Sequence, residues 1–243
     1  MLVAPGLGSW PEGNQILSAA PAGERKEWLP RVEALSLGSG RVLHEDGGSL
    51  AHVYFPIECV IAVLGTSRAG ATSGMALIGR EGLMGFGAAL GDRRAVGTAL
   101  VQTAGRAYRV PVGLFGDSFM QSQALRSVVL RYVSTMVGQL AQTGLCNSQH
   151  SVEQRLCRWL LETLDRAPAA ELRMTQELIG AILGVRREAV TLAATRLQEH
   201  GGIRYGRGHL RVLERAVLEA AACECYASLR SELDRLGRDL AAM

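Results

Sequence analysis

The sequence has no long apolar run. None approaches the roughly 20 consecutive apolar residues that a membrane-spanning helix needs, and no charged-then-apolar export signal opens the chain. Cysteines are few, odd in number and scattered, which does not favour a disulfide framework; they are Cys59, Cys146, Cys157, Cys223 and Cys225. These absences predict a protein that does not enter the membrane and that resides in a reducing cytoplasm.

Catalytic motifs are missing as well. Gly85, Gly87 and Gly91 only half resemble a dinucleotide-binding loop, and the Asp-Arg-Arg that follows does not open a helix. Asp117-Ser118 lacks the glycines of a nucleophile elbow, and no histidine is placed by motif beside a serine or cysteine. We therefore predict that the protein is not an enzyme.

Lysine is nearly absent, because Lys26 is the single lysine among 26 basic residues. Arginine carries the remaining positive charge, and its planar fork of donors suits phosphates and guanine edges. A net charge of +3 is too small by itself to indicate a nucleic-acid binder. From Arg173 to Arg215, however, eight arginines stand against four acids, a larger excess than that of the whole chain.

The N-terminal half is β-rich. Glycines and prolines in residues 1–20 indicate a loose arm, and a short helix is expected at about 22–29. From Arg41 to Val110, short alternating or β-branched runs separated by Gly, Asp and Ser predict a compact β barrel or sandwich. We assign residues 1–113 to this β domain and its arm.

A long helix is predicted next, from about Ser118 to Asn147, within a segment that we place at 114–149. Its apolar residues recur at spacings of three and four. One small domain cannot cover so long a stripe, which favours a parallel copy of the same helix as partner; the alternative is that the β domain alone covers it. The predicted dimer-interface residues are Leu125, Val129, Tyr132, Val133, Met136 and Leu140.

Residues 150–243 form a predicted helical module. Ser151 and Gln154 suit a capping box at the start of a helix over 150–164. Thr175 can cap a further helix, and Gly184 supplies the positive φ of a sharp turn before a helix at about 186–199. This spacing is typical of a helix-turn-helix. An ordinary helical hairpin with a solvated end is the alternative.

The second helix of this pair has an outward face that suits a DNA major groove. Arginine can make two bonds to guanine, glutamate can accept from cytosine, and leucine can touch a thymine methyl. A hairpin at 203–213 with glycines at its turn then suits a wing that holds phosphates. The predicted base contacts are Arg186, Arg187, Glu188, Thr191 and Leu192, and the wing's phosphate contacts are Arg204, Arg207, His209 and Arg211.

TQELIGAILGVRREAVTLAATRLQEHGGIRY, followed by the basic hairpin, resembles the winged helix-turn-helix of the bacterial Crp/Fnr transcription-regulator superfamily. The resemblance covers nearly the whole chain. It implies an α+β fold with an N-terminal jelly-roll barrel similar to cyclic-nucleotide-binding domains, a long dimerisation helix and a C-terminal winged helix-turn-helix. Arg187 and Glu188 match an Arg-Glu pair of the cyclic-AMP-responsive branch. Leu192 stands where many members have a second base-contacting arginine, and Thr175 matches the phosphate-contacting cap, with Gln176 beside it.

The resemblance also implies a homodimer that binds an inverted-repeat operator in double-stranded DNA, with RNA polymerase as a further partner. In the cassette that holds cyclic nucleotide in other members, Phe86 replaces a glutamate and Val96-Gly97 replaces an arginine and its neighbour. Arg93 and Arg94, just upstream of Val96, could substitute for that arginine only if the loop were realigned. We therefore predict no cyclic-nucleotide binding and no cofactor. The alternative function is a redox- or small-molecule-sensing module that docks a partner protein.

No metal site is expected. Iron–sulfur members of the superfamily use N-terminal cysteines, and none precedes Cys59 here. Cys223 and Cys225 lie two positions apart in one predicted helix and would point to different sides. Cys146 and His150 could share a metal or act as a thiol sensor, but two ligands are too few for structural zinc. The prediction is that these cysteines only pack.

Overall fold

The computed structural model describes residues 11–167 and 171–243, so the expected chain breaks at Pro5, Gly6, Gly8 and Pro168 lie outside the described residues. The predicted short helix is confirmed as α2 (Ala22–Trp28). Helix α1 (Gln15–Ala19) lies where the sequence indicated a loose arm. It forms because the buried side chain of Asn14 accepts hydrogen bonds from the amides of Ile16 and Leu17, 3.0 and 3.1 Å away.

Two antiparallel sheets form the β domain. The first has the order β1-β7-β3, and the second has the order β2-β6-β4-β5. The arrangement is jelly-roll-like, which confirms the predicted fold class, but the two sheets do not close into a barrel. The strands are β1 (Glu33–Leu37), β2 (Val42–His44), β3 (His52–Pro56), β4 (Val60–Thr66), β5 (Thr72–Ile78), β6 (Thr98–Thr103) and β7 (Gly105–Pro111), with a 3₁₀ turn η1 (Phe86–Leu90).

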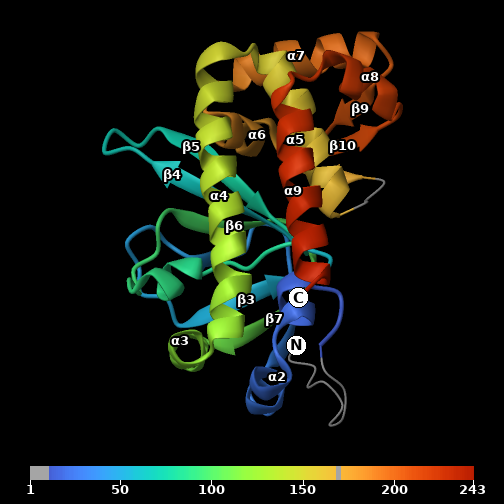
Figure 1. Ribbon diagram of the computed structural model, residues 1–243. Helices are drawn as coiled ribbons and strands as arrows, with labels where there is room; N and C mark the ends of the chain where they lie inside the picture. The colour runs from blue at the N-terminus through green and yellow to red at the C-terminus, as the bar shows by residue number, and fades with distance from the viewer. Residues whose placement is uncertain (1–10, 168–170) are drawn as a thin grey trace.

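The predicted long helix is two helices, α3 (Val112–Gln121) and α4 (Gln123–Gln149). The chain breaks at Ser122, whose extended backbone ends α3 and whose hydroxyl accepts from the amide of Leu125 to cap α4. Helix α4 runs along the β domain, and the C-terminal helix α9 (Cys225–Ala241) returns beside it (Figure 1).

The apolar stripe of α4 faces the protomer's own core rather than solvent. Side chains of the β domain, α1 and α9 pack against it. This placement contradicts the predicted dimer interface for all but Leu140, which is 37% exposed, and it supports the alternative that the protomer covers the stripe itself. The residues that the protomer buries are Leu125, Val129, Tyr132, Val133 and Met136.

The helical half packs around a second apolar cluster, which it shares with Val60, Ala62 and Leu64 of β4 and Leu77 of β5. Helix α5 (Val152–Arg166) begins with the predicted capping box of Ser151 and Gln154. A small sheet with the order β8-β10-β9 packs with the helices around this cluster. The remaining elements are β8 (Leu172–Arg173), α6 (Gln176–Leu183), α7 (Arg187–Glu199), β9 (Ile203–Gly206), β10 (His209–Val212) and α8 (Arg215–Ala221).

Several contacts join the halves. Nε2 of Gln102 on β6 donates to the hydroxyl of Thr163, and its Oε1 accepts from the indole N–H of Trp159, both on α5. The buried guanidinium of Arg166 pairs with Glu81 at 2.7 Å, which ties the end of α5 to the loop after β5. Helix α6 packs on β5, where a Cβ added at Gly74 would lie 2.7 Å from the backbone oxygen of Ile182. No helix in the described part of the chain is long and apolar enough to span a membrane.

Candidate nucleic-acid interface

Glycines set the angle between α6 and α7. Gly184 ends α6 with φ 63° and ψ 37°, a left-handed conformation that costs glycine little. At Gly180, an added Cβ would lie 2.8 Å from the backbone oxygen of Val185, so the turn after α6 folds back too closely for a side chain there. The predicted cap is also present, because the hydroxyl of Thr175 accepts from the amide of Leu178. These local features confirm the helix-turn-helix.

The reading face of α7, which we define as Arg186, Arg187, Glu188, Thr191 and Leu192, is exposed along its whole length. Arg186 is the extended residue before the helix, and the other four lie in its first turns. The opposite side of α7 is buried against the helical core by Val190, Ala193, Ala194 and Leu197. The helical core therefore does not cover the reading face.

Gln176, a predicted phosphate contact, touches two of the predicted base contacts, Arg187 and Thr191. Its Oε1 accepts from Nε of Arg187 at 3.2 Å and from the hydroxyl of Thr191 at 3.1 Å. Arg187 also pairs with Glu177 at 3.0 Å, and both side chains are more than half exposed. A hydrogen bond from its own amide, together with the charge of Arg187, holds the pKa of Glu177 below its usual range. Arg187 is thus held in place by one amide and one carboxylate of α6.

The wing, which we define as the hairpin β9–β10, turns through Arg207 and Gly208. These residues have φ of 51° and 78°, and their neighbours Gly206 and His209 pair across the strands. Two successive positive φ values define a type I′ turn, the two-residue turn that matches strand twist. The turn projects Arg207 away from the helical core, where it is exposed.

Basic residues gather on the outer face of the small sheet. Arg204 lies directly opposite Arg211, and His209 lies opposite Arg173. All four are exposed, whereas Leu172, Ile203 and Leu210 point into the core. Like charges directly opposite each other destabilise a ladder, so this arrangement suits an anionic partner. Arg173 escaped prediction because β8 has only two residues and no recognisable pattern.

One acid interrupts this basic face. Glu171 contacts Nδ1 of His209, and that hydrogen bond lowers the pKa of the glutamate. Of the predicted wing contacts in the described structure, His209 makes an ion pair with an acid. Arg211 makes none within 4.0 Å among the described residues, but its charge also lowers the pKa of Glu171.

The described residues thus combine a two-sheet β domain, a long helix and a winged helix-turn-helix. Residues 154–221 match the Crp-like helix-turn-helix domain family. No curated protein matches the chain significantly. Residues 154–221 thus form a Crp-like helix-turn-helix domain, and the chain as a whole has the fold of the Crp/Fnr transcription regulators, as the sequence resemblance implied.

Solved structures show the same fold. FixK2 from Bradyrhizobium japonicum is similar with a TM-score of 0.66 and 15% identity over 79% of this chain and 98% of its own. A Crp/Fnr-family transcriptional regulator from Thermus thermophilus is similar with a TM-score of 0.63 and 22% identity. The match covers 78% of this chain and 98% of that one. A protein from Eubacterium rectale assigned to the same family is similar with a TM-score of 0.68 and 16% identity. The match covers 85% of this chain and 96% of that one.

Proposed function

We propose that the protein is a homodimeric, sequence-specific DNA-binding transcription regulator without catalytic activity. One observation carries the proposal: the exposed reading face of α7 lies in the same small domain as a sheet whose outer face presents Arg173, Arg204, Arg211 and His209. Base-edge donors on a helix, flanked by phosphate-binding arginines, are the two parts that sequence-specific DNA binding needs. A docking site for a partner protein would not require cations paired across strands.

The proposed mode places α7 in the major groove. Arg187 would exchange Glu177 and Gln176 for a guanine edge, Glu188 would accept from a cytosine amine, and Leu192 would contact a thymine methyl. The amides at the start of α6, capped by Thr175, and the arginines of the wing would hold phosphates on either side. RNA polymerase as a further partner, and a cytoplasmic location, follow from the family pattern and belong to this proposal.

Dimerisation would use the exposed side of α4 rather than its buried stripe. No charged residue lies between Arg131 and Glu153. On this side, large apolar side chains stand in solvent with small residues between them, an arrangement that suits close packing of a second α4. The exposed apolar residues are Leu130 at 44%, Val137 at 60%, Leu140 at 37% and Leu145 at 51%.

Mass measurement of a charged variant tests this interface. Val137→Glu would bury a carboxylate between the two helices, so we expect a monomer by light scattering at a concentration where the unmodified protein is a dimer. Leu90→Glu, which alters an equally exposed residue on η1 at 58%, is the matched control and should stay dimeric. A dimer that survives Val137→Glu would contradict the proposed face.

Selection from random duplexes tests the function. A two-fold dimer should enrich an inverted repeat whose half-site centres lie about 10 base pairs apart. Binding should weaken steeply with salt, and Arg204→Ala or Arg207→Ala should reduce the salt slope by roughly two on every sequence, because each dimer loses two phosphate contacts. Failure to enrich any sequence, with retention of weak and uniform binding, would contradict sequence-specific recognition.

The absence of cyclic-nucleotide binding is also a proposal. Phe86, in the position where binding members carry glutamate, packs edge-on against Tyr132 with ring centroids 6.3 Å apart. Val96 is 69% exposed, and Gly97 follows it in place of the arginine's neighbour. These residues offer an apolar contact and no cation where a cyclic phosphate would need one. Calorimetry with cyclic AMP and cyclic GMP should detect no heat of binding.

A further inference from the structure

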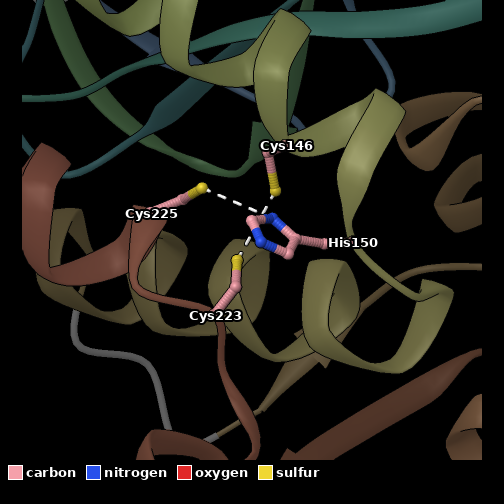
Figure 2. Close-up of side chains that lie close together, drawn as sticks. All are labelled: Cys146, His150, Cys223 and Cys225. Atoms are coloured by element: carbon pink, nitrogen blue, oxygen red, sulfur yellow. Dashed lines mark hydrogen bonds between the residues drawn. The ribbon is translucent and has the colours of Figure 1, made fainter.

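Four side chains with metal-ligating atoms meet at the junction between α4 and the C-terminal helices. Cys146 and His150 come from the end of α4, and Cys223 and Cys225 come from the α8–α9 connection (Figure 2). All of their ligand atoms lie within 4.8 Å of one another. The three cysteines are buried, and the imidazole is partly exposed.

The sequence predicted that Cys223 and Cys225 lie in one helix and point to different sides. This prediction is wrong. Helix α8 ends at Ala221, Ala222 is extended, and α9 begins only at Cys225. Cys223 therefore lies in a bend and not on the same helix as Cys225, so both sulfurs can point to one centre (Figure 2). The bend also faces the end of α4, where Cys146 Sγ lies 3.5 Å from Cys223 Sγ.

We infer that Cys146, His150, Cys223 and Cys225 bind one zinc ion, in a closed site of three thiolates and one imidazole. Zn–S bonds of about 2.3 Å and Zn–N bonds of about 2.0 Å in a tetrahedron separate the ligand atoms by roughly 3.5–3.8 Å. The distances Cys146 Sγ to Cys223 Sγ and Cys225 Sγ to His150 Nδ1 are both 3.5 Å. Four protein ligands leave no open position, as in structural zinc sites.

The imidazole has the orientation of a metal ligand. Its Nδ1 faces the sulfurs, and its Nε2 lies 3.2 Å from the carboxylate of Glu224. Metal-binding histidines commonly donate their second N–H to a carboxylate, which fixes the tautomer and the ring. Cys225 is supported in a similar way, because Nε2 of Gln142 donates to its sulfur at 2.9 Å.

The surroundings also suit the charge of such a site. Three thiolates and a neutral imidazole around Zn²⁺ carry a net charge of −1. Arg155 and Arg158 are buried next to the cluster, close enough to interact electrostatically with Cys146 and Cys223. Arg158 pairs with Glu162 at 2.7 Å, but Arg155 has no carboxylate partner among the ion pairs of the described residues. The Nε atoms of both arginines lack hydrogen-bond partners there.

An iron–sulfur cluster would need a wider cage. Its cysteines bind different iron atoms, with sulfide between them, so their sulfurs lie farther apart than ligands of a single ion. The 4.8 Å limit leaves room for one ion. Tetrahedral sulfur–nitrogen coordination favours zinc among the common single ions.

Zinc at this position would join the end of α4 to the start of α9, on either side of the winged helix-turn-helix in the chain. This consequence rests on the proposed function: the ion would hold the DNA-binding domain at a fixed angle to the dimer helix. Metal binding itself does not depend on it, so the two can fail separately.

Metal analysis of the full-length protein, purified with reductant, tests the site. We expect about one zinc per chain, and cobalt(II) in its place should give the intense visible absorption of a tetrahedral thiolate site. Cys223→Ser and Cys225→Ser should lose both signals, whereas Cys59→Ser, at a buried cysteine outside the cluster, should keep them. Glu224→Gln should keep the ion and weaken zinc affinity by about 10-fold.

Metal removal from the unmodified protein covers the case in which a serine variant does not fold. A chelator should lower the unfolding temperature, and zinc but not magnesium should restore it. With operator DNA, the zinc-free protein should bind more weakly than the zinc-loaded one. A protein without metal and without a cobalt spectrum, iron with labile sulfide, a Cys146–Cys223 disulfide in place of metal, or full zinc in both cluster variants would each overturn the proposal.

Discussion

Arg187 decides whether α7 reads bases, and its replacement by alanine is the sharpest test of the proposed interface. A bidentate arginine–guanine contact is worth about 1–3 kcal/mol. A dimer uses two such contacts, so Arg187→Ala should cost about 2–6 kcal/mol on the full operator. The ion pair with Glu177 at 3.0 Å must be broken first, which moves the expected loss toward the lower end. We expect an affinity about 30-fold to about 300-fold weaker, since about 1.4 kcal/mol corresponds to tenfold.

Arg196 provides the matched control on the same helix. It is 56% exposed and lies 3.5 Å from Glu153 of α5, away from the reading face. Arg196→Ala removes the same charge, so it should produce a small loss that is equal on all duplexes. Fluorescence anisotropy would compare both variants on the operator and on operators with one base pair changed. Equal behaviour of the two variants on every duplex would show that Arg187 contacts only phosphate, and no loss for Arg187→Ala would remove α7 from the interface.

Three further substitutions test other parts of the structure. Gly180→Ala places a Cβ 2.8 Å from a backbone oxygen and should lower the free energy of unfolding by about 1–3 kcal/mol. Gly116→Ala in α3, where an added Cβ meets no atom within 4 Å, should raise it by roughly 0.5–1 kcal/mol. Urea denaturation measures both changes. Arg166→Met leaves Glu81 buried without its cation and should lower the free energy of unfolding by about 3–5 kcal/mol. Adding Glu81→Leu should recover most of this loss. A double variant as unstable as the single one would contradict the argument. Glu177→Gln removes the competitor for Arg187 and should tighten operator binding without changing base preference, and unchanged affinity in anisotropy titrations would count against the exchange.

The helix-turn-helix could be predicted because its determinants are local. Thr175 caps α6 through an amide three residues away, and Gly184 takes the one backbone conformation that a sharp turn there requires. Neither depends on what packs against the module. The start of α7 was therefore predicted to within one residue, at Arg186 instead of Arg187.

The role of α4 could not be predicted in the same way. Periodicity shows that one side of a helix is apolar but does not show what covers it. Leu125, Val129 and Met136 give the same pattern whether the partner is a second copy or the protomer's own β domain. The structure assigns them to the core, and the weaker, small-residue side of the helix is left exposed.

The cysteine cluster could not be predicted from the sequence, because only the tertiary structure brings its residues together. Cys146 and Cys223 are 77 positions apart, and no motif links them. The bend that separates Cys223 from Cys225 occurs within an alanine-rich run that has neither glycine nor proline, so helix propensity predicts one continuous helix. Packing of α9 along α4 overrides that propensity.

The DNA-binding domain is held to the rest of the protomer on more than one side. The pair of Arg166 with Glu81 fixes the end of α5, and the glycines Gly74 and Gly184 let β5 and the helix-turn-helix meet at backbone distance. Because α6 and α7 share one core and a rigid turn, α7 must follow any displacement of α6.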